Sequence, residues 1–478
     1  MERPQVSPIE RLPVEITQKI LSTVTDLLSL RCAALSCPAL FYAFIDAENA
    51  ITTRVLSTQV GFDVLPEAIA ASESSQLPSH TEDEIQEFVA NHLCRRRSPS
   101  ESWTLASALP IGKFHNCVSA FARMFVNNIS IIENFRRVGW LDPTYDETYR
   151  IERALYRFEV FRNIFSKSRR IEAERNVFFA NFAPWENEQL GCIHDFLVRA
   201  VSPAFDDVAE HDITWGELRV EYGVGIESPY IQHLLSLGLE KLHQIVTAET
   251  YEARHKLLND RRFSCPRIRT DFLYDALDNM NEPDDDNTPL LSDFTPEDER
   301  SHIRPPFFDD PDSGPAEIWR WAHQDETKQQ FVYQKSRGPL REWGYVMWDS
   351  RRLHDLGILQ KTFDTEGAWN ASRLDSDQQG RHRAEMAMSW EARSKIYMAG
   401  GRGWWSVGDD SKIVWIGGKA PHERPYTRAH TKPISVEDAR DILQMMKLPS
   451  SVTNFWTVKY HDRSLYAQHI SQRQHRYH

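Results

Sequence analysis

The chain has 478 residues, a formal net charge of −13 at pH 7, and 41% hydrophobic against 26% charged residues. This length exceeds what one hydrophobic core usually supports, so we expect two or three structural units. The acidic surplus argues against a nucleic-acid partner, because neutralising phosphates needs surplus Lys and Arg, and the lack of a run of roughly 20 apolar residues argues against a membrane partner.

The first predicted element is a short helix that begins near Pro13. Proline costs little at the first helical position, because the N–H that it lacks would have no partner there. Beyond it, Ile16, Ile20 and Leu21 fall on one helical face, which Val24 continues. This apolar face needs a covering surface.

Two more helices are predicted before residue 60. Asp26 is a good N-cap for a second helix, in which Leu27, Leu30 and Ala34 form another apolar stripe. Pro38 starts a third helix, "ALFYAFIDAENAITTRVL". Three short helices bury too little surface to be secure alone, so they need either the rest of the chain or another protein.

The stretch "LPVEITQKIL" with "DLLSLRCAALSCPALFYAF" resembles the F-box, a three-helix module that docks substrate receptors onto the Skp1 adaptor of cullin-based ubiquitin ligases. The short connection "STVTDLL" and "LFYAF" in place of a Trp are similar to fungal F-box-like proteins. The resemblance covers about a tenth of the chain, and we assign it to residues 7–60.

The resemblance implies a substrate receptor that is not itself an enzyme, with a Skp1-like adaptor, a cullin bound through it, and an unknown protein client as partners. Docking of this kind seats a few apolar side chains in a complementary surface. The implied Skp1-binding residues are Leu12, Pro13, Ile16, Ile20, Leu21, Leu28 and Leu30. Two alternatives are a ligase-independent F-box-like interaction protein and a module in which these residues are all internal core.

Residues 61–83 are rich in Ser, Glu and Pro and predict a linker.

The cysteines indicate the cellular compartment. The six cysteines are scattered without a C-x-x-C pair, and no secretory signal begins the chain. We therefore expect a cytoplasmic or nuclear protein with reduced cysteines. "CRRRSPS" at 94–100 fits a nuclear-localisation fragment, a phosphorylation site at Ser98, or a solvated helix end.

Residues 84–278 predict a helical domain. Its clearest helix is "YRIERALYRFEVFRNIF", which has apolar residues at helical spacing and therefore buries one face. Arg150, Arg153 and Arg157 repeat on another face. We interpret this as a solvated basic face, with a site for an acidic partner as the alternative.

Residues 279–315 are crowded with Asp, Glu and Pro and predict a mobile or loosely attached loop. The following residues, 316–478, are rich in Trp, which indicates a packed unit. The runs "FVYQ", "YVMWD" and "KIVWIGG" suggest strands there. The predicted fold class is therefore mainly α: an N-terminal three-helix F-box-like module, a helical middle domain and a Trp-rich α+β C-terminal unit.

The densest group of aromatic and basic residues lies in "REWGYVMWDSRRLHDLG". Aromatic residues and Arg dominate binding hot spots, so this segment is a possible client-binding surface. Its candidate residues are Trp343, Tyr345, Trp348, Arg351 and Arg352. The alternative is that the tryptophans form the core of the C-terminal unit and that Asp349 pairs with an arginine.

No nucleotide-binding, hydrolase or zinc-protease motif is found in the sequence, so we expect no catalytic residues, no metal and no cofactor. The one enzymatic alternative is "HQD", because His323 and Asp325 have the spacing of an iron-binding facial triad. Its conceivable third ligands are His354, His382 and His422. The other interpretation of the triplet is a surface histidine near a carboxylate.

Overall fold

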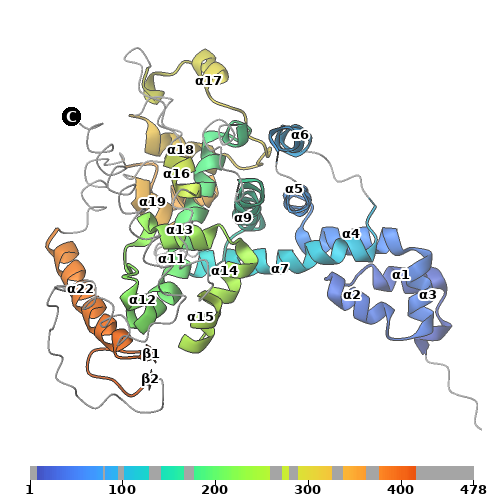
Figure 1. Cartoon of the computed structure of the whole chain (residues 1–478). Coiled ribbons are helices and arrows are strands. Elements are labelled where there is room, and N and C mark those ends of the chain that lie inside the picture. Colours follow the sequence, from blue (N-terminus) through green and yellow to red (C-terminus); the bar gives the residue numbers. More distant parts are fainter. Residues whose placement is uncertain are drawn as a thin grey trace, which may run out of the picture. The chain divides into compact units, whose positions relative to one another are not determined.

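The computed structural model describes the ranges 8–78, 81–94, 102–128, 142–165, 177–258, 272–278, 289–325, 337–361 and 376–415. Within them the chain is mainly helical with a two-stranded sheet, which confirms the predicted fold class at this level (Figure 1). Contacts divide the chain into residues 1–416 and 417–478, and every element described below belongs to the first unit.

The N-terminal residues form the expected short helices. The Asp26 side chain accepts a hydrogen bond of 2.8 Å from the Ser29 backbone N–H, which caps the second helix as its sequence predicts. The predicted third helix is divided, because the backbone leaves the helical region at Ala47 with φ −132° and ψ 29°. The elements are η1 (Pro8–Arg11), α1 (Val14–Leu21), α2 (Leu27–Ala34), α3 (Pro38–Asp46) and α4 (Glu48–Val60).

The prediction of a linker over residues 61–83 is wrong for most of this segment. It contains helix α5 (Leu65–Ser74) and the start of α6 (Glu82–His92). Leu65, Ala68 and Ala71 of α5 are buried, and α5 packs against α9 (Tyr145–Phe165). The Ser and Glu residues of this segment are typical of a linker, so the sequence did not predict helix α5. The small alanines of α5 allow it to pack closely against α9.

Helix α11 lies at the centre of the middle region. It packs against α9 and against a series of shorter helices on either side, and Figure 1 shows it surrounded by them. Helix α7 packs against α9 and also along α4, so it links this region to the N-terminal helices. The bounds are α7 (Leu105–Asn127), α11 (Pro184–His211), α12 (Ile213–Glu217), η2 (Gly225–Glu227), α13 (Pro229–Leu235), α14 (Leu239–Val246), α15 (Tyr251–Leu258) and α16 (Leu273–Asp278).

The C-terminal part of this unit is also helical, and its sheet is one short antiparallel hairpin in which Arg402 lies opposite Val414. "KIVWIGG" contains one of these strands, "YVMWD" forms a 3₁₀ turn instead, and "FVYQ" lies outside the described residues. The elements are η4 (Leu291–Asp293), α17 (Pro296–His302), α18 (Gly314–His323), α19 (Gly338–Glu342), η7 (Tyr345–Met347), α20 (Ser350–Asp355), α22 (Ser376–Met398), β1 (Gly401–Gly403) and β2 (Ile413–Trp415).

The buried hydrophobic residues form one continuous core. It extends from Leu21 in α1 to Met386 in α22 and includes Trp319 and Trp348 of the Trp-rich segment. The expected separation of a helical domain from a Trp-rich unit at residue 316 is therefore not found in the described part of the chain.

Candidate functional site

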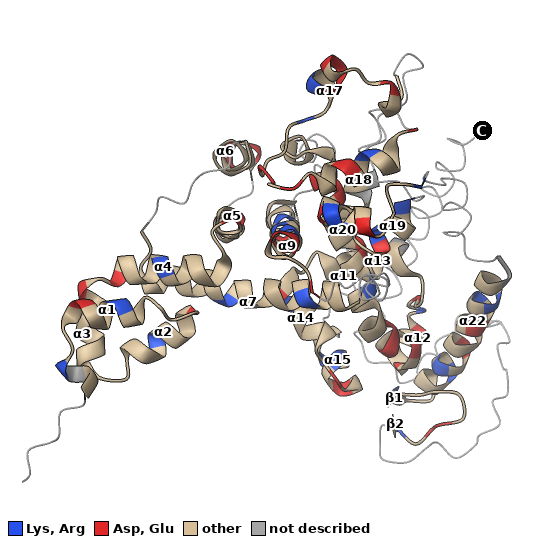
Figure 2. Ribbon diagram, turned by 180° about the vertical axis from the view of Figure 1, so that it is seen from behind, with Lys and Arg blue, Asp and Glu red and all other residues tan. Residues whose placement is uncertain are grey.

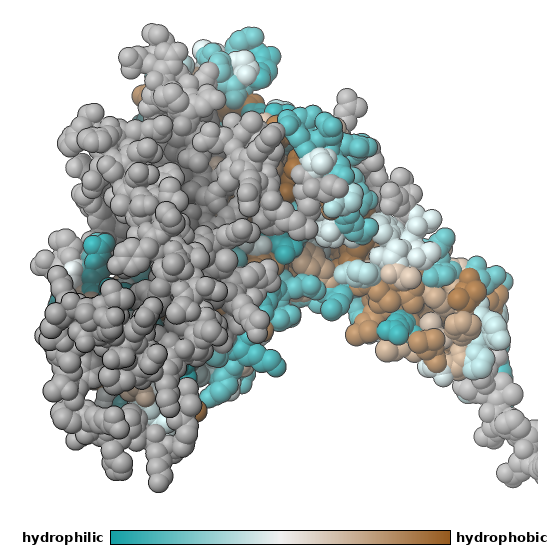
Figure 3. All heavy atoms as spheres, viewed as in Figure 1, coloured by the Kyte–Doolittle hydropathy of each residue, from teal (hydrophilic) through white to brown (hydrophobic). Residues whose placement is uncertain are grey.

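Large hydrophobic side chains are exposed on the N-terminal helices. Nine of the eighteen exposed large hydrophobic residues among the described ranges lie between residues 12 and 45. Figure 3 shows hydrophobic residues gathered over α1, α2 and α3. We call this set the N-terminal apolar face: Leu12, Val14, Ile16, Ile20, Leu28, Leu35, Phe41, Tyr42 and Ile45.

Helix α1 has an inner and an outer side. Thr17 and Leu21 are buried, whereas Ile16 and Ile20, which also lie one turn apart, are 46% and 41% exposed. The Gln18 side-chain amide donates to the Ala43 carbonyl at 3.2 Å and to the Asp46 carboxylate at 2.9 Å, which holds α1 against α3. The inner side is thus satisfied by the fold, and the outer side is open.

The structure divides the predicted Skp1-binding residues into two groups. Leu12, Pro13, Ile16, Ile20 and Leu28 are exposed. The interpretation that all of these residues are internal core is therefore wrong for this group, because their side chains are not covered by the described part of the chain.

The second group, Leu21 and Leu30, is buried at 1% and 0% exposure. Their assignment as docking residues is wrong, since they hold the helices together. Sequence reasoning also missed Phe41 and Ile45, whose spacing of four residues places them on one side of α3.

The apolar face is joined firmly to the rest of the unit through Gln59 of α4. Its side-chain oxygen accepts from the Leu27 N–H at 3.0 Å, and its amide donates to the Gly112 carbonyl at 2.9 Å. A Cβ atom at Gly112 would lie 2.8 Å from a methyl group of Leu27 and from the Gln59 side-chain oxygen, so a larger residue there would require these side chains to shift. The three helices α2, α4 and α7 therefore meet at one tight junction.

The candidate client-binding residues do not form a common surface. Tyr345, Trp348 and Arg352 are buried, Trp343 is half-buried, and Arg351 is exposed. The prediction of a recognition surface is therefore wrong for the three buried residues, and the core interpretation holds for Trp348. Arg352 is buried because its guanidinium bonds both carboxylate oxygens of Glu147, at 2.7 and 2.5 Å.

On α9, Arg150, Arg153 and Arg157 are also buried, so the prediction of a solvated face is wrong. Figure 2 shows the basic residues of α9 in blue. Arg150 donates to both oxygens of Asp310, at 2.6 and 2.7 Å, and to Asp349 at 2.6 Å. Burial acts to raise the pKa of Asp310, but the hydrogen bonds and charge of Arg150 outweigh it and lower that pKa below its usual value. The arginines of α9 thus join parts of one chain.

The same arginines hold the segment that was expected to be a loose acidic loop. Arg157 bonds Glu186 at 2.6 Å, and this carboxylate also accepts the backbone N–H groups of Phe307 and Phe308 at 2.7 and 3.2 Å. The guanidinium of Arg153 lies 3.6 Å from the centre of the Phe308 ring. The described residues around Phe307 and Phe308 are therefore docked rather than loose.

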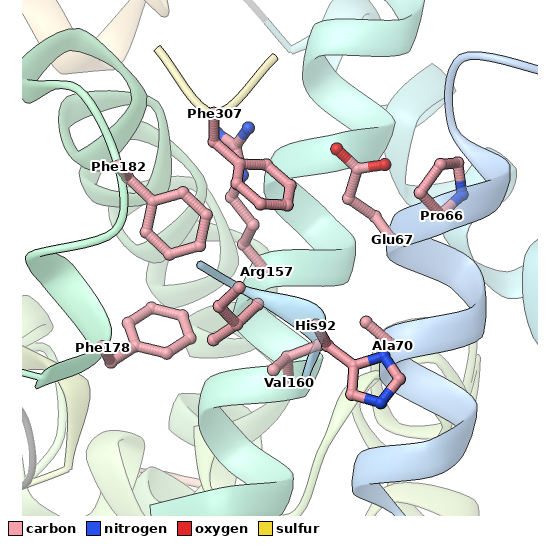
Figure 4. Close-up of a pocket in the computed structure, with 10 residues that line it drawn as sticks. Pro66, Glu67, Ala70, His92, Arg157, Val160, Phe178, Phe182 and Phe307 are labelled. Carbon is pink, nitrogen blue, oxygen red and sulfur yellow. The ribbon is translucent and has the colours of Figure 1, made fainter. Parts of the chain in front are cut away.

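A pocket beside this network is too small to bind a substrate. Phe178, Phe182 and Phe307 line one side of it, and Glu67 and His92 lie on the other (Figure 4). The space that water can enter is about 10 Å³, which is room for roughly one water molecule. We therefore assign it to packing.

The iron-binding triplet is not assembled as a metal site in the described ranges. His323 is buried, with its Nε2 atom 3.1 Å from the Tyr345 hydroxyl, whereas Asp325 is exposed. His354 lies 3.9 Å from Glu317, and His382 donates to the Tyr222 carbonyl. No group of three His, Cys, Asp or Glu side chains suited to a metal occurs among the described residues. His422, the remaining conceivable iron ligand, lies outside the described residues, as does Ser98, the predicted phosphorylation site.

Comparisons with models of protein families, with curated proteins and with solved structures find no match to this chain. Among the residues that the structure describes, no helix has the length and apolar character needed to cross a membrane. The N-terminal apolar face is therefore the candidate site that the geometry itself presents.

Proposed function

We propose that this chain is the substrate-receptor subunit of a Skp1–cullin–F-box type ubiquitin ligase and that it binds a Skp1-like adaptor through the N-terminal apolar face. The observation that carries this proposal is the concentration of exposed large hydrophobic side chains on three short helices. Covering a Leu, Ile or Phe side chain stabilises a complex by roughly 1.5 to 3 kcal/mol. The F-box resemblance of the same residues supports an adaptor as the covering protein.

The mechanism is proximity. The adaptor and cullin would bring a ubiquitin-carrying enzyme to a client held by the remainder of the chain, which raises the effective concentration of the client. No residue of this chain has to react. The junction at Gln59 suits this role, because it fixes the docking helices to α7 and limits how far a bound client could move relative to the ligase.

The test is binding of the full-length chain to a purified Skp1-like adaptor, measured by calorimetry. We expect Ile16→Asp with Ile20→Asp to weaken binding by roughly a hundredfold or more, because two apolar side chains of the interface become charged. Met398→Asp, which changes an exposed side chain of α22, is the matched control and should bind as the native chain does. Equal binding by all three proteins would refute the proposed docking face.

A second measurement separates the receptor from a ligase-independent interaction protein. The complex of chain and adaptor is mixed with a cullin and analysed by size-exclusion chromatography. A receptor gives a ternary complex that the Ile16→Asp, Ile20→Asp variant does not form. A complex of chain and adaptor that excludes the cullin would instead support the ligase-independent role.

A further inference from the structure

A second cleft lies between the end of α11, the middle of α22 and the turn that follows β1. Its volume is about 810 Å³, which is in the range of small-molecule sites. Tyr222 and Trp405 supply aromatic rings to its lining, and Met388 and Val407 supply apolar side chains. None of these residues belongs to the N-terminal apolar face, so this inference is independent of the proposed function.

The Trp405 wall of the cleft is fixed by backbone bonds. The Trp405 N–H donates to the His211 carbonyl at 2.9 Å, and Asp212 forms a β-bridge with Trp404. The indole N–H of Trp405 donates to Asp410 at 2.8 Å, which sets the orientation of the ring. The indole is therefore held in place before any ligand binds.

The Tyr222 part of the lining is held by His382 of α22. Its Nε2 atom donates to the Tyr222 carbonyl at 2.9 Å, and the two rings meet edge to face at 5.7 Å. Asp206 accepts the Gly223 N–H at 2.9 Å and so ties the same loop to α11. The Tyr222 and Trp405 parts of the lining are thus positioned by hydrogen bonds within the chain.

The charged residues that line the cleft are acidic. Asp206, Glu210 and Glu385 contribute carboxylates, and no Lys or Arg is among the described residues that line it. The nearby Arg393 is buried behind the wall, where it donates to the carbonyls of Ala209 and Asp212 at 2.6 and 2.8 Å. The carboxylates give the cleft a negative potential, which attracts cations by Coulomb interaction. The faces of the aromatic rings attract cations as well, through cation–π interaction.

We propose that this cleft binds an organic cation, an ammonium or guanidinium group carried on an aliphatic chain. The cation would lie against the Tyr222 and Trp405 rings, and Glu210 and Glu385 would neutralise its charge. The apolar side chains of Met388 and Val407 would contact the aliphatic part. Such a group could belong to a free polyamine or to a Lys or Arg side chain of a bound peptide.

The experiment is calorimetric titration of the full chain, at physiological salt, with spermidine and with a short peptide of alternating Gly, Lys and Arg. Physiological salt screens non-specific attraction to the acidic chain beyond about 8 Å. Glu210→Gln with Glu385→Gln removes two exposed carboxylates and should weaken binding at least tenfold. Glu82→Gln with Glu87→Gln on α6 makes the same charge change elsewhere and should leave the affinity unchanged.

The two probes distinguish the sources of the cation. Binding of spermidine but not the peptide identifies a small-amine site. Binding of the peptide but not spermidine identifies a site for basic segments. Either result supports the proposal if the variant with Glu210→Gln and Glu385→Gln binds that probe more weakly. Trp405→Leu should weaken the same binding. The proposal is overturned if neither probe binds at millimolar concentration, or if both double variants bind equally well.

Discussion

Apolar side chains are usually buried and charged side chains are usually exposed. The N-terminal apolar face and the arginines of α9 depart from this rule in opposite ways. The first leaves Ile16, Ile20 and Leu28 exposed, and the second buries Arg150 and Arg157. The buried charges are matched within the chain by carboxylates at 2.6 Å, whereas nothing in the described chain covers the exposed side chains. The arginines of α9 therefore find their ionic partners within the chain, whereas the apolar face is open, and we propose that a second protein binds it.

The largest effect is expected when the α9 network loses its central cation. Arg150→Met keeps the size of the side chain but leaves Asp310 and Asp349 without their arginine. Removing one partner of a buried ion pair costs about 3 to 5 kcal/mol, so we expect a decrease of that size in the free energy of unfolding, measured with urea.

Arg351→Met is the control for this change, because Arg351 is an exposed arginine of the neighbouring helix α20. It should alter stability by less than about 0.5 kcal/mol. Adding Asp310→Asn to Arg150→Met should restore part of the loss. Equal, small effects of Arg150→Met and Arg351→Met would show that the network is not closed to solvent.

The next effect tests the two sides of α1. Leu21 is 1% exposed, so Leu21→Ala should lower the free energy of unfolding by about 2 to 5 kcal/mol through lost packing. Ile16→Ala removes atoms that already face water and should change it by less than about 0.5 kcal/mol. Thermal and urea unfolding of the two variants provide the measurement. Similar losses for both would mean that the assignment of inner and outer sides is wrong.

The buried carboxyl of Glu152 on α9 gives a pH-dependent effect. Burial raises the pKa of Glu152 from 4.5 to about 7, although a hydrogen bond from Ser119 acts in the opposite direction. Between pH 4.5 and 7 the folded chain keeps a proton that the unfolded chain has lost, so this group lowers stability as pH rises through that window and the loss persists above it.

Glu152→Gln has no such proton to lose. We expect the variant to gain stability relative to the native chain as pH rises from 4.5 to 7, by up to about 3 kcal/mol above this range. Urea unfolding of both proteins at several pH values measures the difference. A difference that stays constant with pH would contradict the raised pKa.

The smallest effect on stability is expected at the apolar face itself. Ile16→Ser with Ile20→Ser should change the free energy of unfolding by less than about 0.5 kcal/mol per site, but should reduce self-association at high concentration, because exposed apolar patches promote it. Light scattering provides the measurement. A large loss of stability would show that these side chains belong to the core.

Local features of the sequence predicted the N-terminal region well. Short-range rules of capping and helical spacing predict the Asp26 cap, the start of helices near Pro13 and Pro38, and the apolar face that contains Ile16 and Ile20. The assignment of Leu21 to the outer side was wrong because the neighbouring positions 20 and 21 lie about 100° apart on a helix, near the border between its two sides. Periodicity alone could not decide which of the two faces inwards.

The cleft beside α22 could not be predicted from the sequence. Its lining comes from residues near 206, 222, 385 and 405, which lie far apart along the chain. None of these positions stands in a motif, and an acidic or aromatic residue considered alone has no preferred partner. Only the packing of α12 against α22 and the bridge at Trp404 bring them together.

The sequence by itself determined the mainly helical fold, the three short N-terminal helices and their apolar surplus, because these depend on residues within one or two turns of each other. The tertiary structure decided that Arg150, Arg153 and Arg157 are buried, because their partners Asp310, Asp349 and Glu186 lie about 30 to 200 residues away and a charge enters the interior only when such a partner meets it there. It likewise decided that Leu21 supports the core while Ile20 faces out.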